Sequence, residues 1–367
     1  MGNPRTGVFF LILFLGLWFQ AVSQAQTFRI GNVHTLKATA FNRSTKNIYA
    51  IWTDSIRVHY GPDYQSSRLI PIKPPELDYP KGYYPICMDS TLYFVHNQGG
   101  IIYQLKEDSL RRIDRSFNHK MQINSTVFVS NDTLMRYGGY GFWSDRNFFT
   151  YYSKASNEWE IMPPSGSDRL PRGGRMTAVA QKGNKIYIFS GVSTNKFNPL
   201  VFEDRREVWS FDITLRRWDH LGDQDRAFHQ YAEILHLGDR ILYGVPDRTQ
   251  WVLADPAGNQ LSYYDVSADR RGLYPRLPQP TNEIRSFYDH GKMYLVRSKK
   301  PNQSGAQDGE LFYTIMDEET LLGEPAYTEE MYASKRFPIK LAGGAVGVIG
   351  ILLLVFFGRK RYLEKGK

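Results

Sequence analysis

Short runs of apolar and aromatic residues recur along the chain, each bounded by polar turn residues. The runs begin at Ile48, Leu92, Leu134, Ile186, Ile241 and Met293, which places them 42 to 55 residues apart. Runs of three to five such residues are typical of β-strands. The interval matches the length of one four-stranded unit in a repeat architecture.

Turn residues precede four of these runs and predict that each run is the second strand of a hairpin. The turns are Ser130-Asn131-Asp132, Lys182-Gly183-Asn184, Leu237-Gly238-Asp239 and His290-Gly291-Lys292. Gly, Asn and Asp tolerate the left-handed conformations that short hairpin turns require. No long amphipathic helical pattern interrupts residues 27 to 325. We therefore predict an all-β domain, which excludes most α/β enzymes.

Two other all-β architectures are the alternatives for such a chain. Domains of the immunoglobulin-like sandwich type give less regular internal similarity, and the turns of a β-helix repeat at shorter intervals. The spacing favours a β-propeller, in which four-stranded blades surround an axis. Six blades is the natural count, and seven remains open.

The N-terminus carries the pattern of an export signal. Arg5 precedes an apolar stretch from Val8 to Phe19, and small residues follow at Ala21, Ser23 and Ala25. A basic residue, a short apolar core and small residues at a cleavage site define a secretory signal peptide. We predict that residues 1–25 are this signal. The alternative is an uncleaved anchor helix, for which the apolar stretch is short.

A second apolar segment lies near the C-terminus. Leu341 to Phe357 contains no charged residue, and the basic residues Arg359, Lys360 and Arg361 follow it. Because basic residues stay on the cytoplasmic side, the segment predicts one membrane-spanning helix with its N-terminal side outside the cytoplasm. We expect a juxtamembrane linker over 331–340, the transmembrane helix over 341–358 and a basic cytoplasmic tail over 359–367.

Charge and cysteine content indicate which partners and which cellular compartment fit the folded domain. The net charge is +9, but only +3 remains between Gln26 and Pro338, so the folded part has little attraction for nucleic acid. Cys87 is the single cysteine, which excludes an internal disulfide and a cysteine-rich metal site. We interpret Cys87 as a packing residue. An exported domain with almost no cysteine is typical of the bacterial periplasm, where we place it.

Residues 125 to 222 carry one motif twice. The first copy has Gly138-Gly139, Tyr151-Tyr152 and Trp159, and the second has Arg172-Gly173-Gly174-Arg175, Ser190-Gly191, Phe211 and Trp218. In both copies the tryptophan follows an aromatic residue by seven positions. This pattern resembles the kelch repeat of the galactose oxidase and kelch-type propellers. The likeness is weaker over 223 to 330, and over 27 to 124 it rests on the strand pattern alone.

The resemblance implies a kelch-type β-propeller over residues 26–330. Its glycines let the chain turn sharply out of the inner strands, and its aromatic residues fill the wedge between neighbouring blades. A ring of blades also needs a closure, and we expect the strand near Thr27 to Ile30 to pair with the last blade.

Long connections follow the second strand in three blades, at 190–207, 244–260 and 297–309. Lengthened loops on one face of a scaffold commonly build a binding surface. Arginine and exposed aromatic rings suit carboxylated or sugar-like ligands through paired hydrogen bonds and stacking; the alternative is that each residue is an ordinary solvated loop residue. The candidate ligand-binding residues are Tyr140, Trp143, Arg172, Arg175, Phe197, Arg205, His229, Arg248, Trp251 and Arg297.

Enzyme motifs do not emerge from the chain. Galactose oxidase needs a cysteine cross-linked to a tyrosine beside its copper, and Cys87 lies in a poorly matching repeat. The sequence contains no His-x-x-x-His pair, Gly-x-Ser-x-Gly elbow or phosphate loop. We therefore predict no catalytic residue, cofactor or metal.

The functional expectation is a non-catalytic binding or sensing module anchored in the membrane, with an envelope protein or a glycan as its ligand. The alternative is a tethered periplasmic carbohydrate-modifying enzyme, such as an epimerase like the kelch-type sialic acid mutarotases. A third option is an assembly factor that docks another envelope protein. Gly343 and Gly347 have the spacing of helix-dimer interfaces, so a helix-mediated homodimer also remains open.

Overall fold

The computed structural model describes most of the chain between Gln26 and Glu330. The described residues are 26–32, 36–72, 82–116, 121–189, 191–198, 200–223, 233–237, 240–244, 261–265, 270–274, 283–298, 310–317 and 327–330. The signal peptide, linker, transmembrane helix and tail expected at 1–25, 331–340, 341–358 and 359–367 lie outside them. Within these ranges, no helix has the length and apolar character needed to cross a bilayer. The chain divides into two compact units, Met1–Thr328 and Glu329–Lys367.

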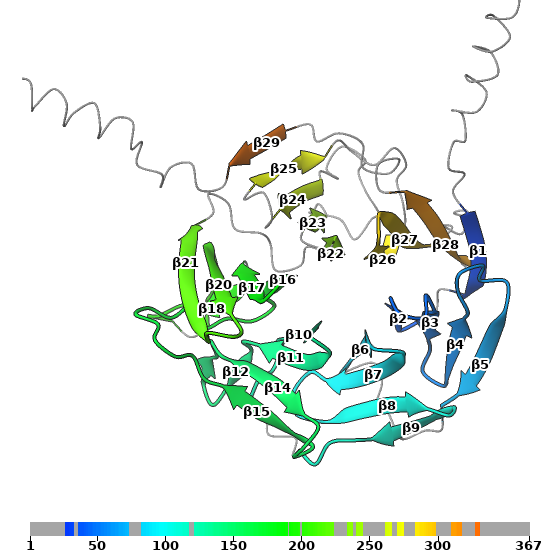
Figure 1. Cartoon of the computed structure of the whole chain (residues 1–367), viewed down its shortest axis with the longest axis horizontal. Coiled ribbons are helices and arrows are strands. Elements are labelled where there is room, and N and C mark those ends of the chain that lie inside the picture. The colour runs from blue at the N-terminus through cyan, green and yellow to red at the C-terminus, as the bar shows by residue number, and fades with distance from the viewer. Residues whose placement is uncertain are drawn as a thin grey trace, which may run out of the picture. The chain divides into compact units, whose positions relative to one another are not determined.

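The described part of the first unit is all-β, as predicted, and consists mainly of four-stranded antiparallel sheets that follow one another along the chain, with one five-stranded sheet and two short hairpins (Figure 1). The first sheet contains β2 (Ala38–Phe41), β3 (Ile48–Ile51), β4 (Ser55–His59) and β5 (Ser67–Pro71). The second contains β6 (Tyr83–Met88), β7 (Thr91–His96), β8 (Ile102–Lys106) and β9 (Ser109–Arg112).

The third and fourth sheets repeat this plan. The third contains β10 (Thr126–Ser130), β11 (Thr133–Tyr137), β14 (Phe149–Ser153) and β15 (Glu158–Met162). The fourth contains β16 (Ala178–Lys182), β17 (Lys185–Phe189), β20 (Glu207–Asp212) and β21 (Arg217–Asp223).

The last two sheets add strands from elsewhere in the chain. The fifth contains β22 (Glu233–Leu237), β23 (Arg240–Gly244), β24 (Leu261–Asp265), β25 (Arg270–Tyr274) and β29 (Tyr327–Glu330). The sixth contains β26 (Glu283–Asp289), β27 (Lys292–Ser298), β28 (Glu310–Asp317) and β1 (Gln26–Asn32). The six apolar runs of the sequence are the strands β3, β7, β11, β17, β23 and β27. Four of them, β11, β17, β23 and β27, were predicted from the preceding turns as second strands of hairpins, which is confirmed.

The N-terminal strand completes the last sheet. β1 pairs antiparallel with β28, with Phe28 opposite Tyr313. The expected pairing of Thr27 to Ile30 with the last sheet is therefore confirmed. Because β1 comes from the start of the chain and β28 from near its end, this pairing joins the two ends of the domain.

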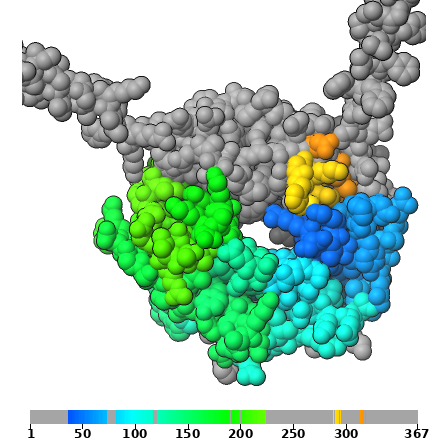
Figure 2. Space-filling view, viewed as in Figure 1, coloured from blue at the N-terminus to red at the C-terminus, as the bar shows by residue number. Residues whose placement is uncertain are grey.

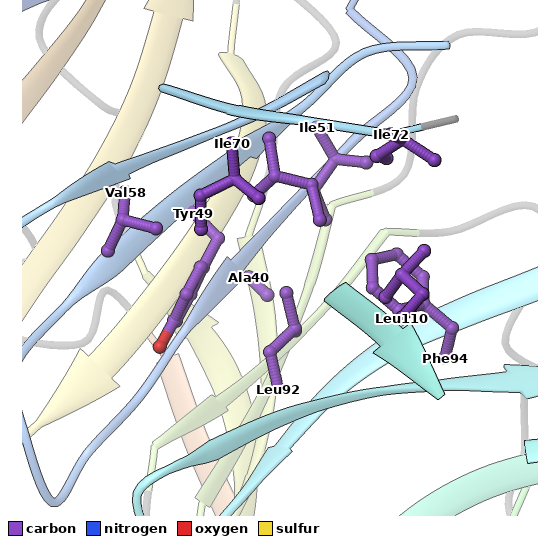
Figure 3. Close-up of a cluster of buried hydrophobic side chains, with 10 residues drawn as sticks. Ala40, Tyr49, Ile51, Val58, Ile70, Ile72, Leu92, Phe94 and Leu110 are labelled. Carbon is purple, nitrogen blue, oxygen red and sulfur yellow. The ribbon is translucent and has the colours of Figure 1, made fainter. Parts of the chain in front are cut away.

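Apolar side chains fill the space between neighbouring sheets. Between the first and second sheets, Tyr49 and Ile51 lie with Leu92, Phe94 and Leu110 in one buried cluster (Figure 3). Cys87 packs against this cluster, and burial raises the pKa of its thiol to about 12. This environment supports the interpretation of Cys87 as a packing residue, because a thiol with so high a pKa is a poor nucleophile.

The motif aromatics occupy the same kind of position. Trp159 Nε1 of the third sheet donates a hydrogen bond to the Gly100 carbonyl of the second, at 2.8 Å. Tyr152 likewise donates from its hydroxyl to the Ile113 carbonyl, at 2.9 Å. Trp218 of the fourth sheet is buried with side chains of the third. Each aromatic thus fills a gap between sheets, as the sequence motif suggested.

The first strands of successive sheets lie closest to one another. β2 contacts β6, β6 contacts β10, and β10 contacts β16 (Figure 1). The described residues of these four sheets, coloured from blue to green, form one continuous packed surface in Figure 2. β22 and β26 make the same contact between the fifth and sixth sheets.

Candidate binding surface

Two short hairpins extend from the third and fourth sheets at the ends of their second strands. β12 (Tyr140–Gly141) and β13 (Ser144–Asp145) lie between β11 and β14. β18 (Val192–Thr194) and β19 (Phe202–Asp204) lie between β17 and β20. β13 contacts β18, and the amide of Thr194 donates to Asp145 Oδ2. We call the two hairpins, together with residues 169–176, the hairpin surface.

Glycine makes the departure of the first hairpin sterically feasible. Gly138 and Gly139 have φ angles of +69° and +95°. A Cβ atom on Gly139 would lie 2.7 Å from the backbone of Gln122, and one on Gly138 would lie 2.3 Å from the Gly174 carbonyl oxygen. Only a residue without a side chain fits both the conformation and the space. The glycine doublet therefore has the steric role expected from the motif.

Arg175 lies between the two hairpins and contacts both. Its Nε is 2.9 Å from Asp145 Oδ1, and its Nη2 donates to Thr194 Oγ1 at 3.0 Å. The guanidinium lies 4.7 Å from the ring centre of Tyr140 and 4.4 Å from that of Phe202. Cation–π contacts with two rings and an ion pair together fix the side chain. Arg175 therefore positions the hairpins, and Tyr140 is part of the same packing.

Arg172 lies at the edge of the hairpin surface. Its Nη2 donates to Glu203 Oε2 at 2.6 Å and to the Thr194 carbonyl at 3.0 Å. The hydrogen bond from Arg172 lowers the pKa of Glu203. Arg172 is exposed, so it is accessible to a ligand while it braces the second hairpin.

Arg205 occupies the interior beneath the surface, which corrects its assignment as a ligand-contacting residue. Its side chain is 1% exposed, and its Nη2 lies 3.8 Å from Glu207 Oε2. Its Nη1 donates to Thr177 Oγ1 at 3.4 Å. The physical reason is the small size of Gly174, where a Cβ atom would lie 2.6 Å from Arg205 Cδ. The glycine leaves room for the arginine to fold inward.

The tips of the hairpins carry large apolar side chains in solvent. Trp143 is 92% exposed, Phe197 90% and Leu200 86%. Phe142, Val201 and Phe202 are also exposed. Sequence reasoning named Trp143 and Phe197 but missed Phe142 and Leu200; their sequence positions next to Trp143 and Pro199 were the available signal. Large exposed apolar side chains on two hairpins that contact each other are typical of interaction surfaces.

The remaining candidates cannot be joined to this surface. His229, Arg248 and Trp251 lie outside the described residues. Arg297 lies within β27, opposite Phe312 and Glu283, and the strand continues to Ser298. Its expected place in a loop is therefore wrong, because the apolar run extends the ladder further than predicted.

Two of the three acidic groups of the hairpin surface are paired with arginine, and the third, Asp204, is exposed. Asp145 pairs with Arg175, and Glu203 pairs with Arg172. Among the described residues, no group of three His, Cys, Asp or Glu side chains is arranged to hold a metal ion. No protein-family model matches the chain, and no curated protein matches it significantly.

Proposed function

We propose that the chain is a non-catalytic binding module built on a kelch-type β-propeller and anchored in a membrane by the segment 341–358. The hairpin surface is its binding surface. The observation that carries this proposal is a set of exposed apolar tips mounted on an internally paired base. Natural scaffolds that hold such tips rigidly reduce the entropy lost on binding.

Contacts between sheets support the propeller architecture. Phe41 and Tyr64 of the first sheet are buried with Tyr294 and Tyr313 of the last. Lys46 of the first sheet also forms an ion pair with Asp289 of the last. The first sheet thus packs against both the second and the sixth. A cyclic succession of sheets, with β1 paired to β28, is the arrangement that closes a propeller.

Sequence patterns support a location outside the cytoplasm. The leader expected at 1–25 and the basic tail expected at 359–367 are typical of a single-pass protein whose folded domain is exported. The bacterial periplasm fits a domain whose single cysteine is Cys87.

The full-length chain in nanodiscs tests the binding function. A double variant, Phe142→Ser with Phe197→Ser, removes two apolar tips, and Leu215→Ser is the control because Leu215 is exposed in the β20–β21 turn. Retention of envelope proteins, glycans and lipid vesicles is measured for each protein. We expect the double variant to lose at least one class of ligand that the control retains. Equal retention by all three proteins would exclude the hairpin surface as the binding surface.

A further inference from the structure

We propose that the hairpin surface binds the lipid–water interface of a membrane, with the tips of β12–β13 and β18–β19 inserted among the lipids. This inference rests on the proposed function and names the partner of that surface. Three observations favour a lipid surface: the chemistry of the tips, the hydrogen bonding of their backbone and the strain in one of the turns.

The tips have the composition of an interfacial anchor. Trp143, Phe197 and Leu200 are almost fully exposed, so they project from the fold. Tryptophan prefers the interface of a bilayer, where its ring meets both lipid and water. Lys196 and Arg146 flank the tips, and such side chains keep their charge at the level of the lipid phosphates. A projecting apolar tip needs no complementary pocket in a bilayer, whereas protein hot spots fit into pockets.

The backbone of the β18–β19 tip is hydrogen-bonded within the tip. Asn195 Oδ1 accepts from the amides of Phe197 and Asn198 at 2.7 and 2.8 Å. The amide of Leu200 donates to Asn198 Oδ1 at 3.0 Å, and that of Val201 donates to the Asn198 carbonyl at 3.0 Å.

Residue 199 is proline and has no amide hydrogen, so every N–H from Phe197 to Val201 is accounted for. In lipid, each unpaired backbone donor is costly, which makes internal pairing the requirement for insertion. A tip that met only water would not need it.

The β12–β13 turn carries strain at aromatic residues. Phe142 and Trp143 have φ angles of +45° and +65°, the left-handed region that favours Asn and Gly. The β10–β11 turn has the same geometry and uses Asn131 and Asp132, which tolerate it. Bulky rings in strained positions are retained where they serve a function.

Two of the acidic groups near the tips are paired with arginine, which reduces their repulsion from an anionic surface. Asp145 and Glu203 are neutralised by Arg175 and Arg172. The hairpin surface contains four basic and three acidic residues, an excess of one positive charge. Insertion of the apolar tips therefore contributes most of the free energy of membrane binding, and the positive charge adds a smaller, salt-dependent contribution.

The predicted anchor keeps this surface near lipid. The linker over 331–340 is ten residues long and spans at most ~35 Å when extended. A tether of this length holds the domain at a high effective concentration beside the bilayer. Weak insertion by a few side chains is then sufficient for lasting contact.

Fluorescent labelling of the full-length chain tests the inference. The variants Leu200→Cys and Leu215→Cys, the second as the control, are each labelled with an environment-sensitive dye. The parent chain is treated with the same dye to check that Cys87 does not react. Each protein is reconstituted in vesicles of phosphatidylcholine and phosphatidylglycerol. Quenching is measured with a lipid-attached nitroxide and with iodide in water.

We expect the lipid quencher to reduce the fluorescence at position 200 and iodide to reduce it at position 215. When Phe197→Ser is added to the Leu200→Cys chain, the dye at position 200 should again be quenched by iodide. Equal iodide quenching at both positions would overturn the membrane contact. Protection of position 200 from both quenchers would also overturn it, because it would indicate that another protein covers this position. In either case, loss of glycan or protein binding in the double variant would leave the binding function standing.

Discussion

Arg175 and Asp145 form an ion pair that joins the hairpin of one sheet to the segment that enters the next. Their side chains are 13% and 7% exposed, and Nε lies 2.9 Å from Oδ1. Because both groups are largely buried, removing one of them leaves a charge without its partner and costs more than breaking a surface pair. The pair therefore couples the two hairpins into one surface.

Arg175→Ala should lower the free energy of unfolding by about 1–3 kcal/mol, because Asp145 would keep its charge in a largely buried place. Urea unfolding measures the change. The control is Arg68→Ala, which breaks the exposed pair with Asp108 and should cost less than about 0.5 kcal/mol. A similar decrease in the free energy of unfolding in both variants would show that removal of Arg175 costs no more than removal of an exposed ion-pair partner.

Phe142→Asn combined with Trp143→Gly should raise the free energy of unfolding by about 1–2 kcal/mol, because both new residues accept the left-handed turn. Thermal unfolding measures this gain. The same variant should bind vesicles less well than the parent. A less stable variant would mean that the aromatic rings support the fold, contrary to their exposure.

Trp159→Phe should destabilise the domain by about 1–3 kcal/mol, since it removes the donor to the Gly100 carbonyl and leaves that oxygen without its partner. The indole also lies 4.3 Å from the guanidinium of Arg136, a contact that weakens with phenylalanine. Trp143→Phe is the matched control and should leave the melting temperature unchanged. An unaffected Trp159→Phe protein would contradict the proposed role in joining sheets.

Acidification should destabilise the domain through His59. Burial lowers the pKa of His59 to about 4, and the charge of Arg57 adds to the effect. The unfolded chain takes up a proton near the ordinary pKa of 6.5, while the folded chain resists until about pH 4.

The stability that His59 contributes is therefore complete above pH 6.5 and declines as the pH falls toward 4, by roughly 2–3 kcal/mol. Urea titrations at several pH values measure the slope. His59→Gln should flatten it, and an identical slope in the variant would assign the effect to other groups.

Deletion of residues 26–32 should lower the melting temperature of the whole domain. Without β1, the backbone edge of β28 loses its partner, and the two ends of the domain are no longer joined. Deletion of the last four residues, 364–367, is the control, because they follow the predicted membrane segment. Unchanged melting would show that β1 does not close the structure.

The sequence alone predicted the all-β class and one strand in each sheet. Runs such as Ile186 to Phe189 alternate with turns of fixed chemistry, and both signals are local, so these strands could be predicted from their own residues. The packing role of Trp159 and Trp218 between sheets was also predicted, from the resemblance of their motif to the kelch repeat.

Tertiary structure decided which arginines face solvent and which hold the fold. Arg172, Arg175 and Arg205 are alike in sequence, yet the first is exposed, the second lies between two hairpins and the third is buried. The difference comes from non-local partners, since Glu203, Asp145 and the space left by Gly174 all come from other segments. Local patterns describe how a chain pairs with its neighbours in sequence. Burial of a charge depends on what the fold brings against it.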